Sequence, residues 1–110
     1  MEGLVRGEIV VLPFPFSDLS ASKKRPALII SILEGDDIIL CQITSQLTRK
    51  DFYAIELFKK DFKEGGLPSN SLIRPNRIFT ADKSIIIRKA GIIKDQKLKE
   101  VQDKLIKIIK

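Results

Sequence analysis

A cationic run that ends at a proline is the first feature of this sequence to suggest chemistry. Lys23, Lys24 and Arg25 stand directly before Pro26, and an apolar run follows. Proline disfavours helical backbone at the residue before it, so Arg25 is expected in extended conformation at the start of a strand. A guanidinium held there can bind a phosphate through a rigid fork of donors. The same residues also fit a solvated basic loop that leads into a core strand.

A second polar group, Thr-Ser-Gln at 44–46, ends a later apolar run. A Glu-Gly-Asp turn signal at 34–36 lies between the two runs, which predicts a β-hairpin. Reflection about this turn pairs Arg25 with Ser45, and facing side chains have Cβ atoms about 5 Å apart. The guanidinium is therefore expected beside the hydroxyls of Thr44 and Ser45. A guanidinium and two hydroxyls placed together can bind a phosphate oxygen.

The composition excludes several kinds of site. The 110 residues contain no histidine and one cysteine, Cys41, which excludes a zinc centre, a histidine-based catalyst and an intrachain disulfide. The lone cysteine is typical of a reducing compartment, so a cytoplasmic protein is expected. A net charge of +6 and a pI near 9.6 favour a polyanionic partner. Residues 1–7 lack the apolar run of a signal peptide, and no segment approaches the roughly 18 apolar residues of a membrane span.

The elements that must position these groups are mostly short strands. The apolar patterns predict strands at 8–12, 26–33, 37–44, 52–58, 71–73, 77–80 and 84–87. Glycine and proline predict a loop over 59–70. Apolar residues at spacings of three and four predict an amphipathic helix over about 96–110, with Asp95 as its N-cap. Many short strands before one helix predict a single domain over 1–110, mainly β, built as a partly closed barrel.

A long loop over 13–24 precedes the cationic run, and loops of this length in a small domain are often functional. The loop carries Phe14 and Phe16. Both phenylalanines fit caps of the core, and either fits an exposed ring that stacks on a nucleobase. We expect one of each, with Phe16 as the exposed ring.

Four short segments form a pattern along the chain. They are Arg6-Gly7-Glu8-Ile9-Val10, Lys24-Arg25-Pro26-Ala27-Leu28-Ile29-Ile30-Ser31, Gln42-Ile43-Thr44-Ser45-Gln46, and Ser71-Leu72-Ile73 followed by Arg77-Ile78-Phe79-Thr80. In this order and spacing they resemble the MazF/PemK (Kid-type) toxins of type II toxin–antitoxin systems over nearly the whole chain. The sequence departs from that family in the first loop, where residues 17–22 replace a glycine–glutamate pair found in many members.

The resemblance implies an SH3-like, partly open β-barrel with a C-terminal helix, a homodimer, and neutralisation by a cognate antitoxin. It implies an mRNA interferase that cuts single-stranded RNA at short sequences and needs no cofactor. It casts Arg25 and Thr44 as the catalytic pair. The expected RNA contacts are Phe16, Lys23, Lys24, Ser45, Gln46, Ser71 and Arg77. A structural ion pair is the alternative role for Arg77.

The chemistry expected of such a site uses the ribose 2′-OH as nucleophile and leaves a cyclic phosphate and a free 5′-OH. Arg25 would neutralise the charge that gathers on the phosphoryl oxygens. Thr44 would hydrogen-bond the phosphate or orient the 2′-OH. Arginine stays protonated in proteins, so it is a poor base. The proton of the 2′-OH would leave to water or to a carboxylate, of which Asp18 is the nearest in sequence.

Two other functions fit a small basic barrel. It could bind RNA without cutting it, with Lys24 and Arg25 holding phosphates. It could also inhibit a protein target such as gyrase, as the similarly folded CcdB-type toxins do. That class typically ends its helix in a Trp-Gly-Ile-like tip, whereas this chain ends in residues 107–110, Lys-Ile-Ile-Lys, and has no tryptophan. The sequence therefore argues against the CcdB-type function.

Overall fold

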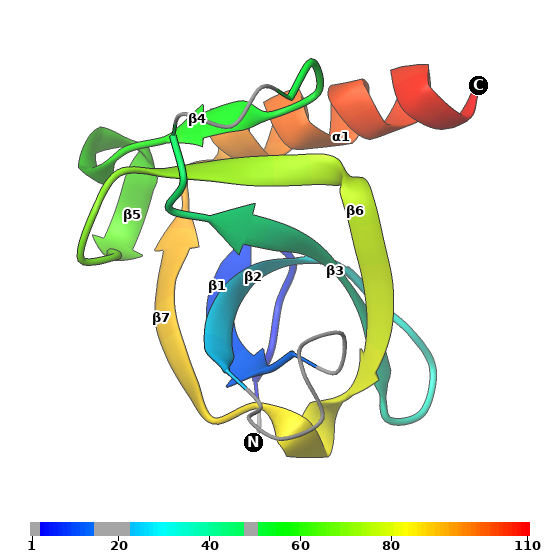
Figure 1. Cartoon of the computed structure of the whole chain (residues 1–110). Coiled ribbons are helices and arrows are strands. Elements are labelled where there is room, and N and C mark those ends of the chain that lie inside the picture. Colours follow the sequence, from blue (N-terminus) through cyan, green and yellow to red (C-terminus); the bar gives the residue numbers. More distant parts are fainter. Residues whose placement is uncertain (1–2, 15–22, 48–50) are drawn as a thin grey trace.

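The fold is a curled antiparallel sheet with one helix beside it, seen in a computed structural model that describes residues 3–14, 23–47 and 51–110 (Figure 1). Seven strands form the sheet in the order β4-β6-β3-β2-β1-β7-β5. In chain order the elements of this part are β1 (Glu8–Pro13), β2 (Lys24–Ile32), β3 (Asp37–Thr44), β4 (Ile55–Leu57), η1 (Lys59–Asp61), β5 (Phe62–Gly65), β6 (Ser71–Asp82), η2 (Lys83–Ile85), β7 (Arg88–Ile93) and α1 (Asp95–Ile109).

Two apolar clusters hold the sheet in its curled shape. Successive residues of a strand point to opposite faces, yet Ile9 and Val10 of β1 are both fully buried. Ile9 belongs to the cluster that includes Val101 of α1, and Val10 belongs to a second cluster that includes Phe14. Burial on both faces explains why the first strands read as continuous apolar runs rather than alternating ones.

The hairpin of β2 and β3 has two registers. Near the turn Ile32 faces Ile38, as reflection about the turn predicts. An irregularity between residues 29 and 31 shifts the remaining pairing by one residue. Continued to the strand ends, the shifted register brings Arg25 opposite Thr44 instead of Ser45. The bulge is the reason that simple reflection misplaces the partner by one position.

The prediction of separate strands at 71–73 and 77–80 is wrong, because both belong to the single strand β6. Arg74 and Ile78 face consecutive residues of β3, so residues 75–77 bulge out of the pairing. Proline has no N–H to donate, and a bulge is one of the few places where a sheet tolerates it. β6 bends sharply along its length (Figure 1), which lets the sheet curl into a barrel.

The prediction of a loop over 59–70 is also wrong, since it contains η1 and β5. β5 pairs with β7 at a point where both strands have glycine. A Cβ on Gly91 would lie 2.6 Å from the carbonyl oxygen of Glu64, and one on Gly65 would collide with the backbone of Ala90. The glycines that predict a turn therefore mark a close approach of two backbones.

The strand predicted at 84–87 is replaced by η2 and an extended connection. Asp82 ends β6 and accepts a hydrogen bond from the backbone N–H of Ser84 at 2.8 Å, which starts the tight turn. The last strand is β7, which begins at Arg88 and pairs with β1 and β5.

The helix prediction is confirmed except at its start. α1 begins at Asp95, and its N-cap is Lys94, which makes no side-chain cap. The carboxylate of Asp95 binds Lys63 at 2.7 Å instead. Lys97 ties the helix to the barrel by donating to the carbonyl of Glu56 at 3.1 Å. α1 lies beside β4 and β6 in Figure 1, and within the described residues there is no helix with the length and apolarity to cross a membrane.

Candidate active site

The ends of β2 and β3 open onto a cleft of about 360 Å³, which lies at the lower end of the volumes of small-ligand sites. We call it the cationic cleft. The side chains that line it are Lys23, Lys24, Arg25, Pro26, Ile43, Thr44, Ser45, Gln46, Leu67, Pro68, Ser69 and Ser71. The structure thus brings together most of the residues that the sequence predicts for the site, from two strands and from a third, distant segment.

Arg25 is exposed, its backbone is part of β2, and its guanidinium lies near an aromatic ring. Its backbone pairs with Leu12 of β1. Its guanidinium carbon lies 6.0 Å from the ring centroid of Phe14, at the outer limit of a cation–π contact. Phe14 is buried and meets the edge of Phe79 at a centroid distance of 5.2 Å. None of the ion pairs between described residues involves Arg25.

Thr44 has an oriented hydroxyl. Its Oγ1 accepts a hydrogen bond from the backbone N–H of Gln46 at 3.1 Å. That bond occupies a lone pair and leaves the hydroxyl hydrogen to donate into the cleft. Thr44 therefore presents a donor to the same space as the Arg25 guanidinium, which suits a phosphate oxygen between them.

Ser71 is a buried residue that lines the cleft. The residue is only 3% exposed, and its hydroxyl donates to the carbonyl of Ser69 at 3.0 Å. This bond fixes the segment before β6 against the cleft. Ser71 lines the site as predicted, but its hydrogen is already committed to the backbone.

Sequence reasoning misses three further lining residues of the cleft, Leu67, Pro68 and Ser69. These residues lie within 59–70, the segment that the sequence predicts as a loop. The available signal was an apolar Leu-Pro pair directly after two glycines in a polar segment. It does not reveal the location, because the segment is brought to the end of β3 by the pairing of Leu72 in β6 with Thr44 in β3.

Two predicted groups of the first loop, Phe16 and Asp18, lie outside the described residues. Arg77 is exposed in the bulge of β6 and does not line the cationic cleft. It also forms no ion pair with the rest of the described chain. The buried ion pair on this strand belongs to Arg74, whose Nε lies 2.9 Å from a carboxylate oxygen of Asp51.

The acids and the thiol with shifted pKa values lie away from the cleft. Burial raises the pKa of Cys41 to about 12. Burial also favours a higher pKa for Asp51, but hydrogen bonds from Arg74 and from the backbone of Tyr53 outweigh it and lower that pKa. The cleft itself has no acidic lining residue in the part of the chain that the structure describes. Nor do three metal-ligating side chains come together there.

Residues 5–109 match the model of a protein family, the PemK-like, MazF-like toxins of type II toxin–antitoxin systems. Comparison with curated proteins finds no sequence match. The structure is similar to that of an endoribonuclease in complex with its cognate antitoxin from a Mycobacterial species, with a TM-score of 0.74 and 15% identity over 96% of this chain and 93% of the other.

Two further solved structures are similar. MazF from Deinococcus radiodurans has a TM-score of 0.71 and 21% identity over 94% of each chain. The Mycobacterium tuberculosis toxin MazF-mt6 has a TM-score of 0.69 and 14% identity over 89% of this chain and 91% of the other. At these identities the likeness shows a shared fold, which confirms the predicted β-barrel with a C-terminal helix. By its match over residues 5–109, the chain belongs to the family of PemK-like, MazF-like toxins of type II toxin–antitoxin systems.

Proposed function

We propose that this chain is a sequence-specific endoribonuclease, an mRNA interferase, which cuts single-stranded RNA in the cationic cleft without a metal ion. The observation that carries the proposal is the meeting of Arg25 and Thr44 in a cleft lined by lysines and hydroxyls. Membership of the toxin family supports it, as does the likeness to a Mycobacterial endoribonuclease.

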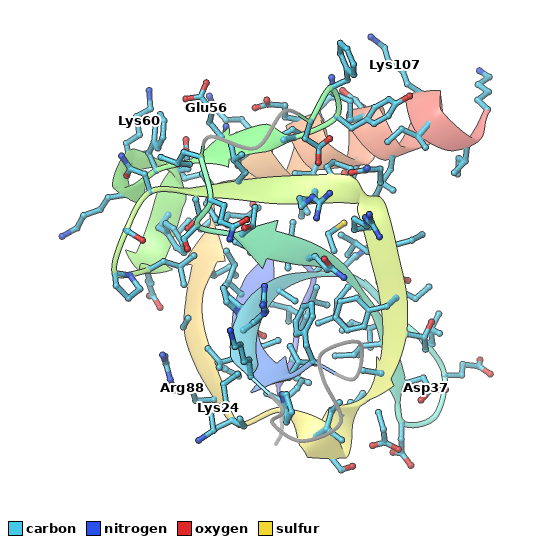
Figure 2. The ribbon with its side chains drawn as sticks, viewed as in Figure 1. Lys24, Asp37, Glu56, Lys60, Arg88 and Lys107 are labelled. Atoms are coloured by element: carbon cyan, nitrogen blue, oxygen red, sulfur yellow. The ribbon has the colours of Figure 1, made fainter. Side chains whose placement is uncertain are left out.

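The positive charge of this side of the barrel supports binding of a polyanion. Lys23 and Lys24 continue the cationic lining beyond Arg25. Arg88 stands on the far side of β1 from Lys24, because β1 pairs with both β2 and β7. Figure 2 shows Lys24 and Arg88 projecting away from the barrel. Phosphates on either side of the scissile one can be held by these cations.

The reaction is an internal transfer. The 2′-oxygen forms a bond to the adjacent phosphorus, and the bond from phosphorus to the 5′-oxygen of the next nucleotide breaks. Arg25 binds the non-bridging oxygens as negative charge accumulates, and Thr44 donates to one of them. The 2′-OH proton leaves to water, and the departing 5′-oxygen takes a proton from water. The products are a 2′,3′-cyclic phosphate and a 5′-OH.

The partners we propose are a cognate antitoxin and a second copy of the chain. The structurally similar Mycobacterial endoribonuclease was solved with its cognate antitoxin. Ile106 and Ile109 of α1 are 52% and 75% exposed, which offers apolar surface for an interface. Light scattering that gives twice the mass of the chain would support the homodimer. We place the activity in the cytoplasm, where RNA and a reducing environment coincide.

One observation favours a different function, a barrel that binds RNA without cutting it. No acidic side chain lines the cleft within the described segments, and the sequence has no histidine. A cleft of cations and hydroxyls would hold a phosphate even without cleavage. No observation of this kind favours CcdB-like inhibition of a protein target.

Purified protein incubated with labelled single-stranded RNA in EDTA separates these functions. We expect fragments with cyclic phosphate ends, and no cut where a 2′-deoxynucleotide replaces the nucleotide before the scissile phosphate. Binding without fragments would establish the non-catalytic function. Cleavage that needs added magnesium would contradict the metal-free mechanism.

A further inference from the structure

A second hollow, of about 180 Å³, adjoins the cationic cleft. We call it the aromatic pocket. It is lined by Leu57, Phe58, Lys59, Phe62, Leu67, Pro68, Ser69 and Asn70. Three of these residues, Leu67, Pro68 and Ser69, also line the cationic cleft, so the two hollows share one wall. A strand of RNA that binds in the cleft and continues over this wall reaches the aromatic pocket.

The two hollows differ in chemistry. The cationic cleft offers cations and hydroxyls, which suit phosphate and ribose. The aromatic pocket has one half-buried phenylalanine, Phe58, beside the buried Phe62 and Leu57, and its exposed lining residues are Lys59, Pro68, Ser69 and Asn70. A guest that suits it has a flat apolar face, a hydrogen-bonding rim and a nearby negative charge. A nucleobase attached to a phosphate chain has all three properties.

The aromatic pocket is held in place before any ligand binds. The backbone N–H of Phe58 donates to the carboxylate of Asp61 at 2.8 Å. The backbone carbonyl of Asp61 accepts from the N–H of Lys94 at 2.8 Å, at the start of α1. Phe62 is 8% exposed and belongs to the main core cluster, whereas Phe58 is half-buried. Phe62 is therefore part of the core, and Phe58 retains some exposed surface.

We infer that the aromatic pocket binds one nucleobase next to the scissile phosphate, with Phe58 stacked on its face and Asn70 reading its edge. The inference rests on the proposed function, and it assigns part of the sequence specificity to residues between β4 and β6. An amide is suited to this task because it offers both a donor and an acceptor. Lys59 also lines the pocket and would supply a cation for the next phosphate.

The test is cleavage of a random-sequence RNA library in EDTA, followed by sequencing of the fragment ends. Wild-type protein should show a preferred sequence around the cut. The Phe58→Ala variant should lose the preference at one position beside the cut and keep it at the others. Its rate on the preferred sequence should fall roughly tenfold or more, as expected for one lost base–aromatic stack. Asn70→Asp, which loses the amide donor, should change the base preferred at that same position.

The matched control is Phe52→Ala. Phe52 is 97% exposed and lines neither hollow, so its loss should leave both the preference and the rate unchanged. Phe58→Leu keeps apolar bulk without an aromatic ring and provides the same test if Phe58→Ala does not fold.

The outcomes separate this inference from the function on which it rests. Cleavage by wild type, together with an unchanged preference in the folded Phe58 variants, would overturn the aromatic pocket and leave the nuclease intact. A uniform loss of rate at every sequence would also overturn it, because Phe58 would then only support the fold. If wild-type protein cuts no RNA, the proposed function fails, and the pocket assignment fails with it.

Discussion

At the scale of single residues, Thr44 is the group whose contribution can be isolated most cleanly. Thr44→Val keeps the shape of the side chain but removes the hydroxyl that Gln46 orients. We expect single-turnover cleavage to slow about tenfold to a hundredfold, since one hydrogen bond to a charged group contributes about 1.5–3 kcal/mol. Thr44→Ser retains the hydroxyl and should stay close to wild type. Equal losses in both variants would point to packing rather than hydrogen bonding.

The ion pair of Asp51 and Arg74 should make stability depend on pH. The two side chains are only 5% and 11% exposed, and the pKa of Asp51 is lowered in the fold. A lowered pKa stabilises the fold above the unfolded value of about 4, and that stability is lost as the pH falls further. Asp51→Asn should cost about 3 kcal/mol at pH 7, because it leaves Arg74 buried without its partner.

Urea unfolding of wild type and Asp51→Asn between pH 2 and about pH 7 measures this difference. The curve of the variant should be flatter in the acid range. Identical pH dependence in the two proteins would show that other carboxylates, and not Asp51, govern acid unfolding.

Cys41 should be inert in the native protein. It is fully buried on β3, and burial raises its pKa to about 12, so almost no thiolate exists at pH 8. We expect no reaction with a thiol reagent in buffer and one equivalent after denaturation. Rapid labelling under native conditions would mean that β3 opens readily.

At the scale of elements, local pattern predicted β1, β2, β3 and α1, because each has continuous apolar runs or helical spacing. It failed where pairing overrides local signals. β6 pairs with β3 on both sides of the bulge at 75–77, although the proline at its start predicts the end of a strand. β5 forms because Gly65 and Gly91 let two backbones approach, and a single sequence shows glycine only as a turn signal.

The residues of the candidate site also fall into two groups, those that local sequence pattern could place and those that it could not. Arg25 and Thr44 could be brought together from sequence because one short hairpin joins them, and a one-residue bulge shifts their register only slightly. Leu67 and Pro68 could not be placed, because their position depends on pairing of strands far apart in the chain. Arg77 does not line the cleft, because it lies in the bulge at 75–77, and a single sequence does not show where a strand bulges.

The close approach of β5 to β7 can be tested with neighbouring glycines. Gly65→Ala should destabilise the fold by more than about 1 kcal/mol, because the residue has a φ of +70° and its Cβ would collide with the backbone of Ala90. Gly66→Ala should cost little, since nothing lies within 4 Å of its added Cβ. Thermal unfolding of both variants measures the difference. Equal stability of the two would contradict the tight packing of β5 on β7.

At the scale of the whole molecule, the barrel presents an exposed cationic cleft at the ends of β2 and β3. The Cα radius of gyration of 13.2 Å is the value expected for a compact chain of this length. The apolar clusters lie on either side of the sheet, and the cleft residues come from the ends of β2 and β3, from the segment 67–69 and from the start of β6. This arrangement allows site residues to be substituted without loss of the core.

Arg25 is the residue on which the account of RNA cleavage depends most. It is exposed, so Arg25→Ala should leave the fold intact, with an unchanged circular dichroism spectrum. Arg25→Lys should restore little of the lost rate, because an ammonium is a point charge and cannot make the two-pronged contact of a guanidinium.

Single-turnover cleavage of a labelled RNA in EDTA by wild type and Arg25→Ala is the decisive measurement. We predict a rate about 10²–10³ lower for the folded variant, the loss expected when a preorganised donor to the transition state is removed. A well-folded Arg25→Ala protein that cuts at nearly the wild-type rate would contradict the assignment of the cationic cleft as the active site.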